Sequence, residues 1–268
     1  MAFTLGAEAR AAGFQLVQFD RLGSTNAEAL VRGRSGERGP TWFVAREQSA
    51  ARGRRGNAWA SPAGNLAASL LKVVDVPPPL AATLGFVAGL ALADALAEVA
   101  PYLGRGSSAE PSGRVALKWP NDVLVDGAKL AGILLESEQT DHGRALVIGI
   151  GVNVASAPEG LPYPAAALAS LGVSVTAETL FTALSDSWVA CEGLWDQGRG
   201  LSAVRRRWLD RAAGLGRPVA VRIGQQILRG TFETIDDSGQ LVLRRADGGT
   251  AAIAAGDVHF GEAATARA

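Results

Sequence analysis

The sequence contains few of the residues that carry out much of enzyme chemistry. Its 268 residues include one cysteine, Cys191, and two histidines, His142 and His259, which lie far apart in polar segments. A single cysteine excludes an internal disulfide, and the apolar residues before Cys191 are typical of a buried helix face, so we expect a core thiol rather than a nucleophile. With only two separated histidines, a histidine-based metal site or a Ser-His-Asp triad has little support.

Lysine is also scarce, because the chain has 23 arginines but only the three lysines Lys72, Lys118 and Lys129. Since arginine is used wherever a generic cation suffices, we interpret a retained lysine as a compact, strongly hydrated point charge with a specific task. All five asparagines lie between Asn26 and Asn153. This distribution indicates that the polar chemistry is concentrated in that part of the chain.

No charge bias or membrane signal is evident. The formal net charge is +0 and the isoelectric point is about 6.8, which argues against a general nucleic-acid or membrane-surface binder. Glu8 and Arg10 interrupt the N-terminal segment, and no apolar signal-peptide core follows them. The longest apolar stretch, residues 80–93, is too short to span a bilayer. We therefore expect a buried helix there, in a cytoplasmic protein that has no membrane partner.

Hydrophobic patterning predicts an α+β fold. Strands are expected at residues 17–20, 41–46, 65–74, 115–119, 123–125, 129–138 and 145–154. Helices are expected at residues 27–32, with Ser24 or Thr25 as N-cap, and at 80–99, 177–197 and 201–213. Asp126-Gly127 is a hairpin signal. Residues 104–113, rich in glycine and serine, predict a mobile surface loop.

The composition changes near residues 214–216. Residues 218–260 contain several short strands separated by turn signals at 237–239 and 247–249. A segment of this size suits a small β-barrel, whose closure protects its edges. We therefore predict a catalytic domain at residues 1–214 and a small C-terminal domain at 215–268.

A basic loop occupies residues 48–59. Arg52, Arg54 and Arg55 lie there without an acid among them, and Gly53 and Gly56 let the backbone approach a ligand closely. Guanidinium groups bind phosphate and carboxylate oxygens in a bidentate manner. A solvated basic loop is the alternative. Mutual repulsion of the arginines predicts a loop that is disordered when empty and becomes ordered around an anion.

A second polar cluster occupies residues 118–122, with Lys129 just beyond it. The segment combines a cation, Lys118, a rigid turn, an amide, Asn121, and a carboxylate, Asp122. Asp122 could hold Mg²⁺, which needs one or two carboxylates together with phosphate oxygens. The alternative is a hairpin corner in which Asn121 and Asp122 only satisfy backbone groups.

The common nucleotide-binding signatures are missing. No P-loop motif occurs, and the pair Gly149 and Gly151 lacks the third glycine and the following helix of a dinucleotide fingerprint. The basic loop and the cluster at 118–122 nevertheless favour an enzyme that activates a small carboxylic acid with ATP.

Together these motifs resemble the biotin–protein ligase family. The resemblance is carried, in family order and with family-like spacing, by residues 24–26, 47–56, Trp59, 61–62, 64–66, 118–122, 129–134 and 149–153. The chain departs from many members at Ser49, Ala51, Asn57 and Ala58. These departures are mild, and the match covers most of the first 155 residues.

The resemblance implies a class II synthetase-like mixed sheet with flanking helices and an SH3-like C-terminal β-barrel. It also implies that biotin and ATP form biotinyl-5'-AMP, from which biotin passes to a lysine of the biotin-carrier domain of acetyl-CoA or a related carboxylase. ATP and Mg²⁺ would be the co-substrate and ion, with no tightly bound prosthetic group.

Residue roles also follow from the resemblance. It places biotin against Ser24, Thr25, Asn26, Gln48, Arg52, Gly53, Arg54, Lys129 and Gly132. It places the nucleotide against Arg52, Arg54, Trp59, Lys118, Asn121, Asp122 and Asn153. Catalytic roles fall to Arg54, Lys129 and Asp122. Asp122 would also hold Mg²⁺, and we hypothesise that it deprotonates the acceptor lysine.

Three alternatives remain to be distinguished. A lipoate–protein ligase shares the fold and the adenylation chemistry, and a non-catalytic biotin sensor would be expected to have lost Arg54, Asp122 or Lys129. A DNA-binding repressor is disfavoured because only 23 residues precede Ser24, too few for a helix-turn-helix domain. We expect a monomer or a weak homodimer, formed through an edge strand within residues 65–74 or 145–154.

Overall fold

The computed structural model describes residues 2–104 and 115–260. The loop predicted at residues 104–113 lies outside these ranges apart from Gly104. The larger part of the molecule is a mixed seven-stranded sheet in the order β1-β2-β3-β7-β6-β5-β4, in which β1 and β2 are parallel and the other neighbours antiparallel. The strands are β1 (Gln15–Leu22), β2 (Thr41–Gln48), β3 (Leu66–Val74), β4 (Val115–Lys118), β5 (Asp122–Val125), β6 (Ala128–Thr140) and β7 (Gly143–Val152).

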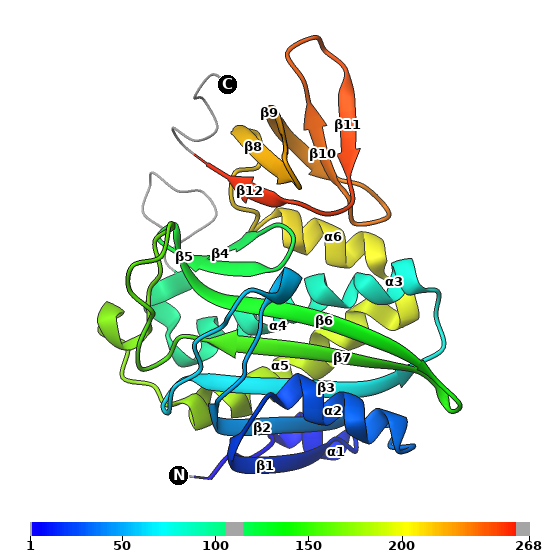
Figure 1. Cartoon of the computed structure of the whole chain (residues 1–268), viewed down its shortest axis with the longest axis vertical. Coiled ribbons are helices and arrows are strands. Elements are labelled where there is room, and N and C mark those ends of the chain that lie inside the picture. The colour runs from blue at the N-terminus through cyan, green and yellow to red at the C-terminus, as the bar shows by residue number, and fades with distance from the viewer. Residues whose placement is uncertain (1, 105–114, 261–268) are drawn as a thin grey trace.

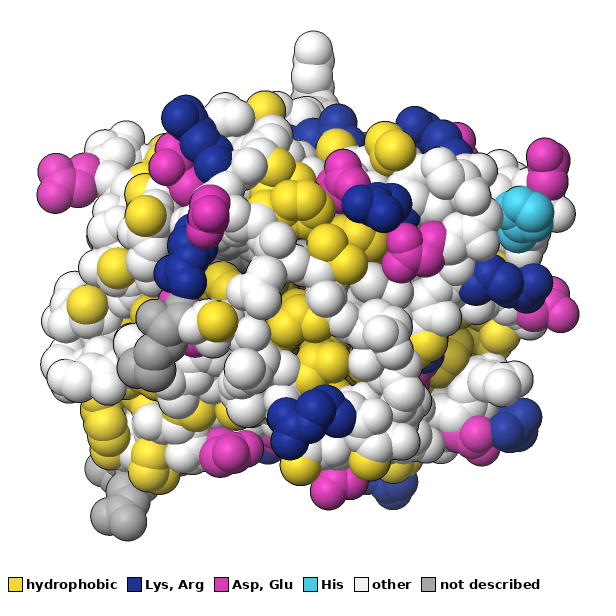
Figure 2. Space-filling view, turned by 90° about the horizontal axis from the view of Figure 1, so that it is seen from below, with side chains coloured by type: hydrophobic (Ala, Val, Ile, Leu, Met, Phe, Trp, Pro, Cys, Tyr) yellow, Lys and Arg dark blue, Asp and Glu magenta, His cyan; other side chains and the backbone are white. Residues whose placement is uncertain are grey.

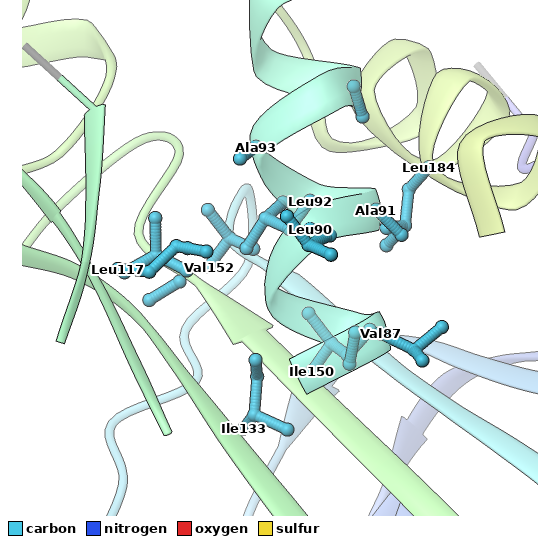
Figure 3. Packing of buried hydrophobic residues seen from close by; sticks show 14 of the residues in the cluster. Val87, Leu90, Ala91, Leu92, Ala93, Leu117, Ile133, Ile150, Val152 and Leu184 are labelled. Carbon is cyan, nitrogen blue, oxygen red and sulfur yellow. The ribbon is translucent and has the colours of Figure 1, made fainter. Parts of the chain in front are cut away.

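Helices cover both faces of this sheet. Helix α2 (Thr25–Arg34) lies on one face, and α4 (Leu84–Val99) and α5 (Ala177–Trp195) lie on the other (Figure 1). Successive side chains of a strand point to opposite faces, so Phe43 packs toward α2 while Trp42 packs toward α5. Figure 3 shows Leu117, Ile133, Ile150 and Val152 of the sheet against α4. Burial on both faces explains why the central strands read as continuous apolar runs.

The bounds of two helices differ from those predicted from the sequence. The helix predicted at 80–99 is interrupted at Thr83 between α3 (Pro78–Ala82) and α4, and the Thr83 hydroxyl accepts a hydrogen bond from Trp195 Nε1 at 2.8 Å. The helix predicted to run to residue 213 ends earlier, as α6 (Leu201–Leu209). Residues 211–213 instead run beside β4, where Leu117 N donates to Arg211 O and Ala213 N donates to Leu117 O.

Helices α3 and α4 form the most apolar helical stretch among the described residues. Pro78–Val99 has the length and hydropathy of a membrane span, which is longer than the apolar stretch considered from the sequence. Of its most apolar window, 72% is buried between the sheet and α5. It is therefore the core helix that the sequence predicted.

The strands proposed as dimer edges are in fact central. The prediction for residues 65–74 and 145–154 is wrong, because β3 and β7 pair with each other in the middle of the sheet. The edges are β1 and β4, and β4 is partly covered by residues 211–213. On the side of the molecule nearest β1, acidic and basic side chains are scattered among apolar ones (Figure 2). Charges on an edge discourage pairing with another strand.

The C-terminal part forms a separate five-stranded antiparallel sheet in the order β11-β10-β9-β8-β12, which has the predicted SH3-like character. It lies beyond β4 and β5 (Figure 1). Its strands are β8 (Pro218–Ile223), β9 (Gln226–Ile235), β10 (Leu241–Arg244), β11 (Thr250–Ile253) and β12 (Asp257–His259). The last strand therefore returns to the side of the molecule that carries the predicted site.

Candidate functional site

The predicted site residues meet around one pocket. It is formed by the N-terminus of α2, the basic loop, the start of β3 and the neighbouring ends of β5, β6 and β7. The lining includes Ser24, Thr25, Asn26, Gln48, Arg52, Gly53, Arg54, Trp59, Asn121, Asp122, Lys129 and Gly132. Residues from a wide span of the sequence thus share one concave surface.

One wall of the pocket is a buried network of uncharged polar groups. Ser24 is the N-cap of α2, and its hydroxyl accepts from Ala27 N. Thr25 donates to Gln48 Oε1 from its backbone N at 2.8 Å and from its hydroxyl at 3.1 Å. Asn26 Oδ1 accepts from the hydroxyl of Ser69 at 2.6 Å. Such a satisfied network fixes the direction of each donor and acceptor, which suits recognition of a polar ligand group.

Glycines of β6 and β7 make room for the side chains of this wall. A Cβ atom at Gly149 would lie 2.2 Å from Asn26 Oδ1, and one at Gly151 would lie 2.6 Å from Trp59 Nε1. Gly132 pairs with Gly151 across the strands and also lies beneath the Trp59 ring. These glycines are therefore needed for close packing, which explains a Gly-x-Gly pattern without a dinucleotide fold.

The opposite side of the pocket is cationic. Lys129 Nζ lies 2.8 Å from Asp122 Oδ1 and 5.6 Å from the ring centroids of both Trp59 and Tyr163. The backbone of Lys129 is held on both sides, because its N donates to Pro164 O and its O accepts from Ala166 N. The ammonium group is thus fixed at the pocket wall by a carboxylate and two aromatic faces.

The basic loop folds over the pocket as an irregular hairpin. Arg52 and Ala58 pair across it, Gly53 N donates to Asn57 O, and Trp59 N donates to Ala51 O. At its tip, Arg55 has a φ of 56°. The hairpin therefore directs several guanidinium groups toward neighbouring polar groups.

Arg54 points to the corner between β4 and β5. Its guanidinium donates to Asn121 Oδ1 at 3.1 Å, and Asn121 in turn donates from Nδ2 to Ile133 O. Burial lowers the pKa of Arg54, and the negative charge of Asp257 opposes that effect. Burial likewise lowers the pKa of Lys118, which Asp122 opposes. Since both groups remain cations at neutral pH, they place positive charge in a partly desolvated region.

The structure adds Glu136 to the residues predicted from the sequence. Its carboxylate accepts from Asn26 Nδ2 at 2.8 Å and pairs with Arg52 at 3.2 Å. The acidic residues near the end of β6 are typical of a solvated strand end, so the sequence pattern did not assign Glu136 to the site. Period-two alternation, which puts Glu136 on the same face as Gly132 and Leu134, was the available signal.

Two predicted residues, Lys118 and Asn153, do not line the pocket. The ammonium of Lys118 lies 5.6 Å from the ring centroid of Phe260, farther toward the C-terminal domain. Asn153 is buried, and its Nδ2 donates to Ala166 O. It thereby supports the segment that holds the backbone of Lys129.

Asp122, which the sequence suggested as a magnesium ligand, is one of the two carboxylates that line the pocket, the other being Asp257. Within the described residues no three side chains among histidine, cysteine, aspartate and glutamate form a metal cluster. A single carboxylate is compatible with Mg²⁺ when phosphate oxygens and water complete an octahedron, as happens when the ion arrives with ATP. The residues present therefore fit a nucleotide-bound ion rather than a resident one.

Comparison with known proteins agrees with this arrangement. Residues 20–153 match the biotin/lipoate A/B protein ligase family, and residues 214–261 match the biotin protein ligase C-terminal domain. A biotin–[acetyl-CoA-carboxylase] ligase of Paracoccus denitrificans is 43% identical over 90% of this chain and 98% of its own length. The corresponding ligase of Mycobacterium tuberculosis is 37% identical over 91% and 88% of the two chains.

Solved structures show the same fold. Aquifex aeolicus biotin protein ligase in complex with biotin and ATP superposes with a TM-score of 0.72 at 22% identity, covering 91% of this chain and 97% of the other. Leishmania major biotin protein ligase in complex with biotinyl-5-AMP gives 0.61 at 26% identity, covering 90% and 98%. The chain therefore belongs to the biotin/lipoate A/B protein ligase family and carries the C-terminal domain of biotin protein ligases.

Proposed function

We propose that the protein is a monofunctional biotin–[acetyl-CoA-carboxylase] ligase. Biotin and ATP give biotinyl-5'-AMP and pyrophosphate, and the ε-amine of a lysine then attacks the adenylate to form an amide and release AMP. The observation that carries this proposal is the pocket itself, which joins a buried uncharged polar wall to a cationic wall. The Paracoccus denitrificans relative, similar over 98% of its length, supports the same activity.

The uncharged wall suits the ureido head of biotin, which has two N–H donors and one carbonyl acceptor. Ser24, Thr25, Asn26 and Gln48 offer both donors and acceptors there, in fixed directions. Gly132 has no side chain, so the ring of Trp59 lies close to its backbone beside this wall. The carboxylate end of biotin would then lie toward Lys129, Arg52, Gly53 and Arg54.

The first step needs no general base. A carboxylic acid with a pKa of about 4 to 5 is already ionised at neutral pH and can attack the α-phosphorus directly. The step requires charge neutralisation and in-line alignment. Lys129, Arg52 and Arg54 provide fixed positive charge, Trp59 and Asn121 shape the nucleotide side, and Mg²⁺ bound with ATP neutralises phosphate charge.

The second step requires a neutral acceptor amine. Asp122 lines the pocket, and its Oδ1 is paired with Lys129 Nζ at 2.8 Å. As a carboxylate at the pocket wall, Asp122 can accept a proton from the incoming ammonium. Asp122 thus serves as proton acceptor, with Lys118 and Asn153 supporting the nucleotide side from behind.

Several wider properties belong to the same proposal. The acceptor is the biotin-carrier domain of acetyl-CoA carboxylase or a related carboxylase. The enzyme works in the cytoplasm, as a monomer or weak homodimer, without DNA or membrane partners. Residues 1–214 form the catalytic domain and residues 215–268 the SH3-like domain.

Calorimetry with biotin, with and without ATP and Mg²⁺, tests the substrate assignment. We expect biotin to bind alone, and ATP with Mg²⁺ to convert it to a tightly held adenylate. The same titration with lipoate tests the alternative ligase, because both acids undergo the same chemistry. Binding of lipoate in preference to biotin would contradict the proposal, as would binding of biotin without any turnover of ATP.

A further inference from the structure

The tip of the basic loop is fastened to the C-terminal domain by one ion pair. Arg55 Nη1 lies 2.5 Å from Asp257 Oδ2, although the two residues are 202 positions apart in the sequence. Within residues 2–104 and 115–260, Arg55 forms no other ion pair. No motif of the sequence predicted it.

Asp257 is placed at the border of the site. It is the first residue of β12, and its backbone lies opposite Arg222 in the antiparallel register of β12 and β8. It also lines the pocket together with Arg54 and Asn121. Its charge also opposes the lowering of the pKa of Arg54 and of Lys118 by burial. The carboxylate is therefore close enough to influence two cations besides its direct partner.

Besides this ion pair, the loop is held at its base and through Arg54, whose guanidinium donates to Asn121 Oδ1 at 3.1 Å. Gln48 pairs with Ser61 where the loop begins, and Arg52 pairs with Glu136 beside the uncharged wall. The tip, around Arg55, is anchored from the other side by Asp257. The hairpin is therefore attached to the rest of the molecule through Arg52, Arg54 and Arg55, and Asp257 is the attachment that comes from the C-terminal domain.

We propose that Asp257 is a positioning residue that latches the basic loop closed from the C-terminal domain, through Arg55. The latch keeps Arg52 and Arg54 directed into the pocket and delays escape of the adenylate. This inference rests on the proposed function, and it makes the SH3-like domain part of the lid.

The expected effect is modest. The side chains of Arg55 and Asp257 are 43% and 50% exposed, so solvent screens the pair. Half-exposed ion pairs change an equilibrium by roughly two- to fivefold. Release of biotinyl-AMP should therefore be roughly two- to fivefold faster in Asp257→Asn, and the difference should shrink at high salt.

The test measures how long the protein retains biotinyl-AMP after it is formed from biotin and ATP and separated from excess substrates. Arg55→Asp brings two acids together, and Arg55→Asp with Asp257→Arg reverses the pair. Aspartate tolerates the left-handed backbone of position 55 better than most residues. We expect Arg55→Asp and Asp257→Arg, each alone, to release the adenylate faster than the wild type. The double variant should recover retention.

Asp237→Asn is the matched control. Asp237 is also a C-terminal-domain carboxylate that pairs with an arginine of the first domain, Arg205 on α6, but neither lines the pocket. It should retain the adenylate like the wild type. Trypsin cleavage after the loop arginines, measured with biotin present, should be faster in Asp257→Asn than in Asp237→Asn.

Three outcomes overturn the latch: equal retention in Asp257→Asn and wild type, equal trypsin cleavage in the two asparagine variants, or no recovery in the reversed pair. Wild-type protein that forms no biotinyl-AMP overturns the proposed function, and the latch with it. Wild-type protein that forms and retains biotinyl-AMP while Asp257→Asn does so equally well overturns the latch alone.

Discussion

Lys129 and Asp122 form a mostly buried ion pair, 2.8 Å from Nζ to Oδ1, that joins β6 to β5 at the cationic wall of the pocket. The same ammonium lies between the rings of Trp59 and Tyr163. A buried cation held in this way is already desolvated and oriented. It can therefore stabilise negative charge that develops near it without further reorganisation.

Replacing Lys129 with glutamine should slow adenylate formation by about a hundredfold or more, the usual cost of losing one preorganised charge donor. Single-turnover formation of biotinyl-AMP measures this step. Lys72→Gln is the control, because Lys72 has a similar exposure of 20% and also pairs with a carboxylate, that of Glu192, away from the pocket. It should lower stability but leave the rate of the folded enzyme unchanged. Similar rates in Lys129→Gln and the wild type would remove Lys129 from the chemistry.

Glu136 should matter for binding biotin rather than for the chemical step. Glu136→Ala removes the ionised acceptor of Asn26 Nδ2, which keeps only the longer bond to Leu134 O at 3.3 Å, and leaves Arg52 without this ion-pair partner. Losing a hydrogen bond to a charged group costs about 1.5–3 kcal/mol. The KM for biotin should rise by roughly tenfold or more, with little change in kcat. Glu136→Gln keeps an acceptor for Asn26 and should show a smaller effect. Glu138→Gln, which affects only an exposed pair with Arg34, should behave like the wild type.

The glycine at position 149 is predicted to be essential for the uncharged wall. In Gly149→Ala the new methyl group would lie 2.2 Å from Asn26 Oδ1, so Asn26 must move away from Ser69. Biotin binding should be lost or greatly weakened, which calorimetry can measure. Gly85→Ala on α4 is the contrasting variant, because a Cβ there meets nothing within 4 Å. It should bind biotin normally and be more stable by about 0.5–1 kcal/mol.

Cys191 should be inert in the native protein. Burial, with the nearby carboxylate of Asp94, raises the pKa of this thiol to about 12. The pKa of this thiol is therefore higher in the folded protein than in the unfolded chain. The buried neutral thiol contributes its full stability below the pKa of the unfolded chain, and this contribution is lost as the pH rises toward 12. Unfolding titrations should show a steeper alkaline loss for the wild type than for Cys191→Ser. Rapid alkylation of the native thiol near neutral pH would show that it is not buried as described.

The basic loop should become ordered around its ligand. Repulsion among Arg52, Arg54 and Arg55 opposes the closed hairpin, and a bound anion removes that repulsion. Trypsin should therefore cut the loop readily in the empty protein and slowly when biotin and ATP are present. Equal cleavage in both states would contradict ordering of the loop by the ligand.

The sequence motifs predicted most of the pocket because they lie within short segments. Residues 24–26, 118–122 and 129–132 each carry their own geometry through a helix cap, a tight turn or strand alternation. Asp257 could not be found in this way, since its role depends on how β12 packs beside a loop some 200 residues earlier. Residues 211–213 were assigned to a helix because their pattern continues that of α6, whereas in the structure they form turns that hydrogen-bond to the edge of β4 at Leu117.

Isotope exchange between pyrophosphate and ATP tests the central claim most directly, because it detects formation of an acyl-adenylate without any acceptor protein. We predict that the wild-type protein exchanges label only when biotin and Mg²⁺ are present, that lipoate does not replace biotin, and that Lys129→Gln reduces the rate by about a hundredfold or more. Exchange that does not depend on biotin, or no exchange at all from folded protein, would contradict the assignment of this pocket as a biotin-activating site.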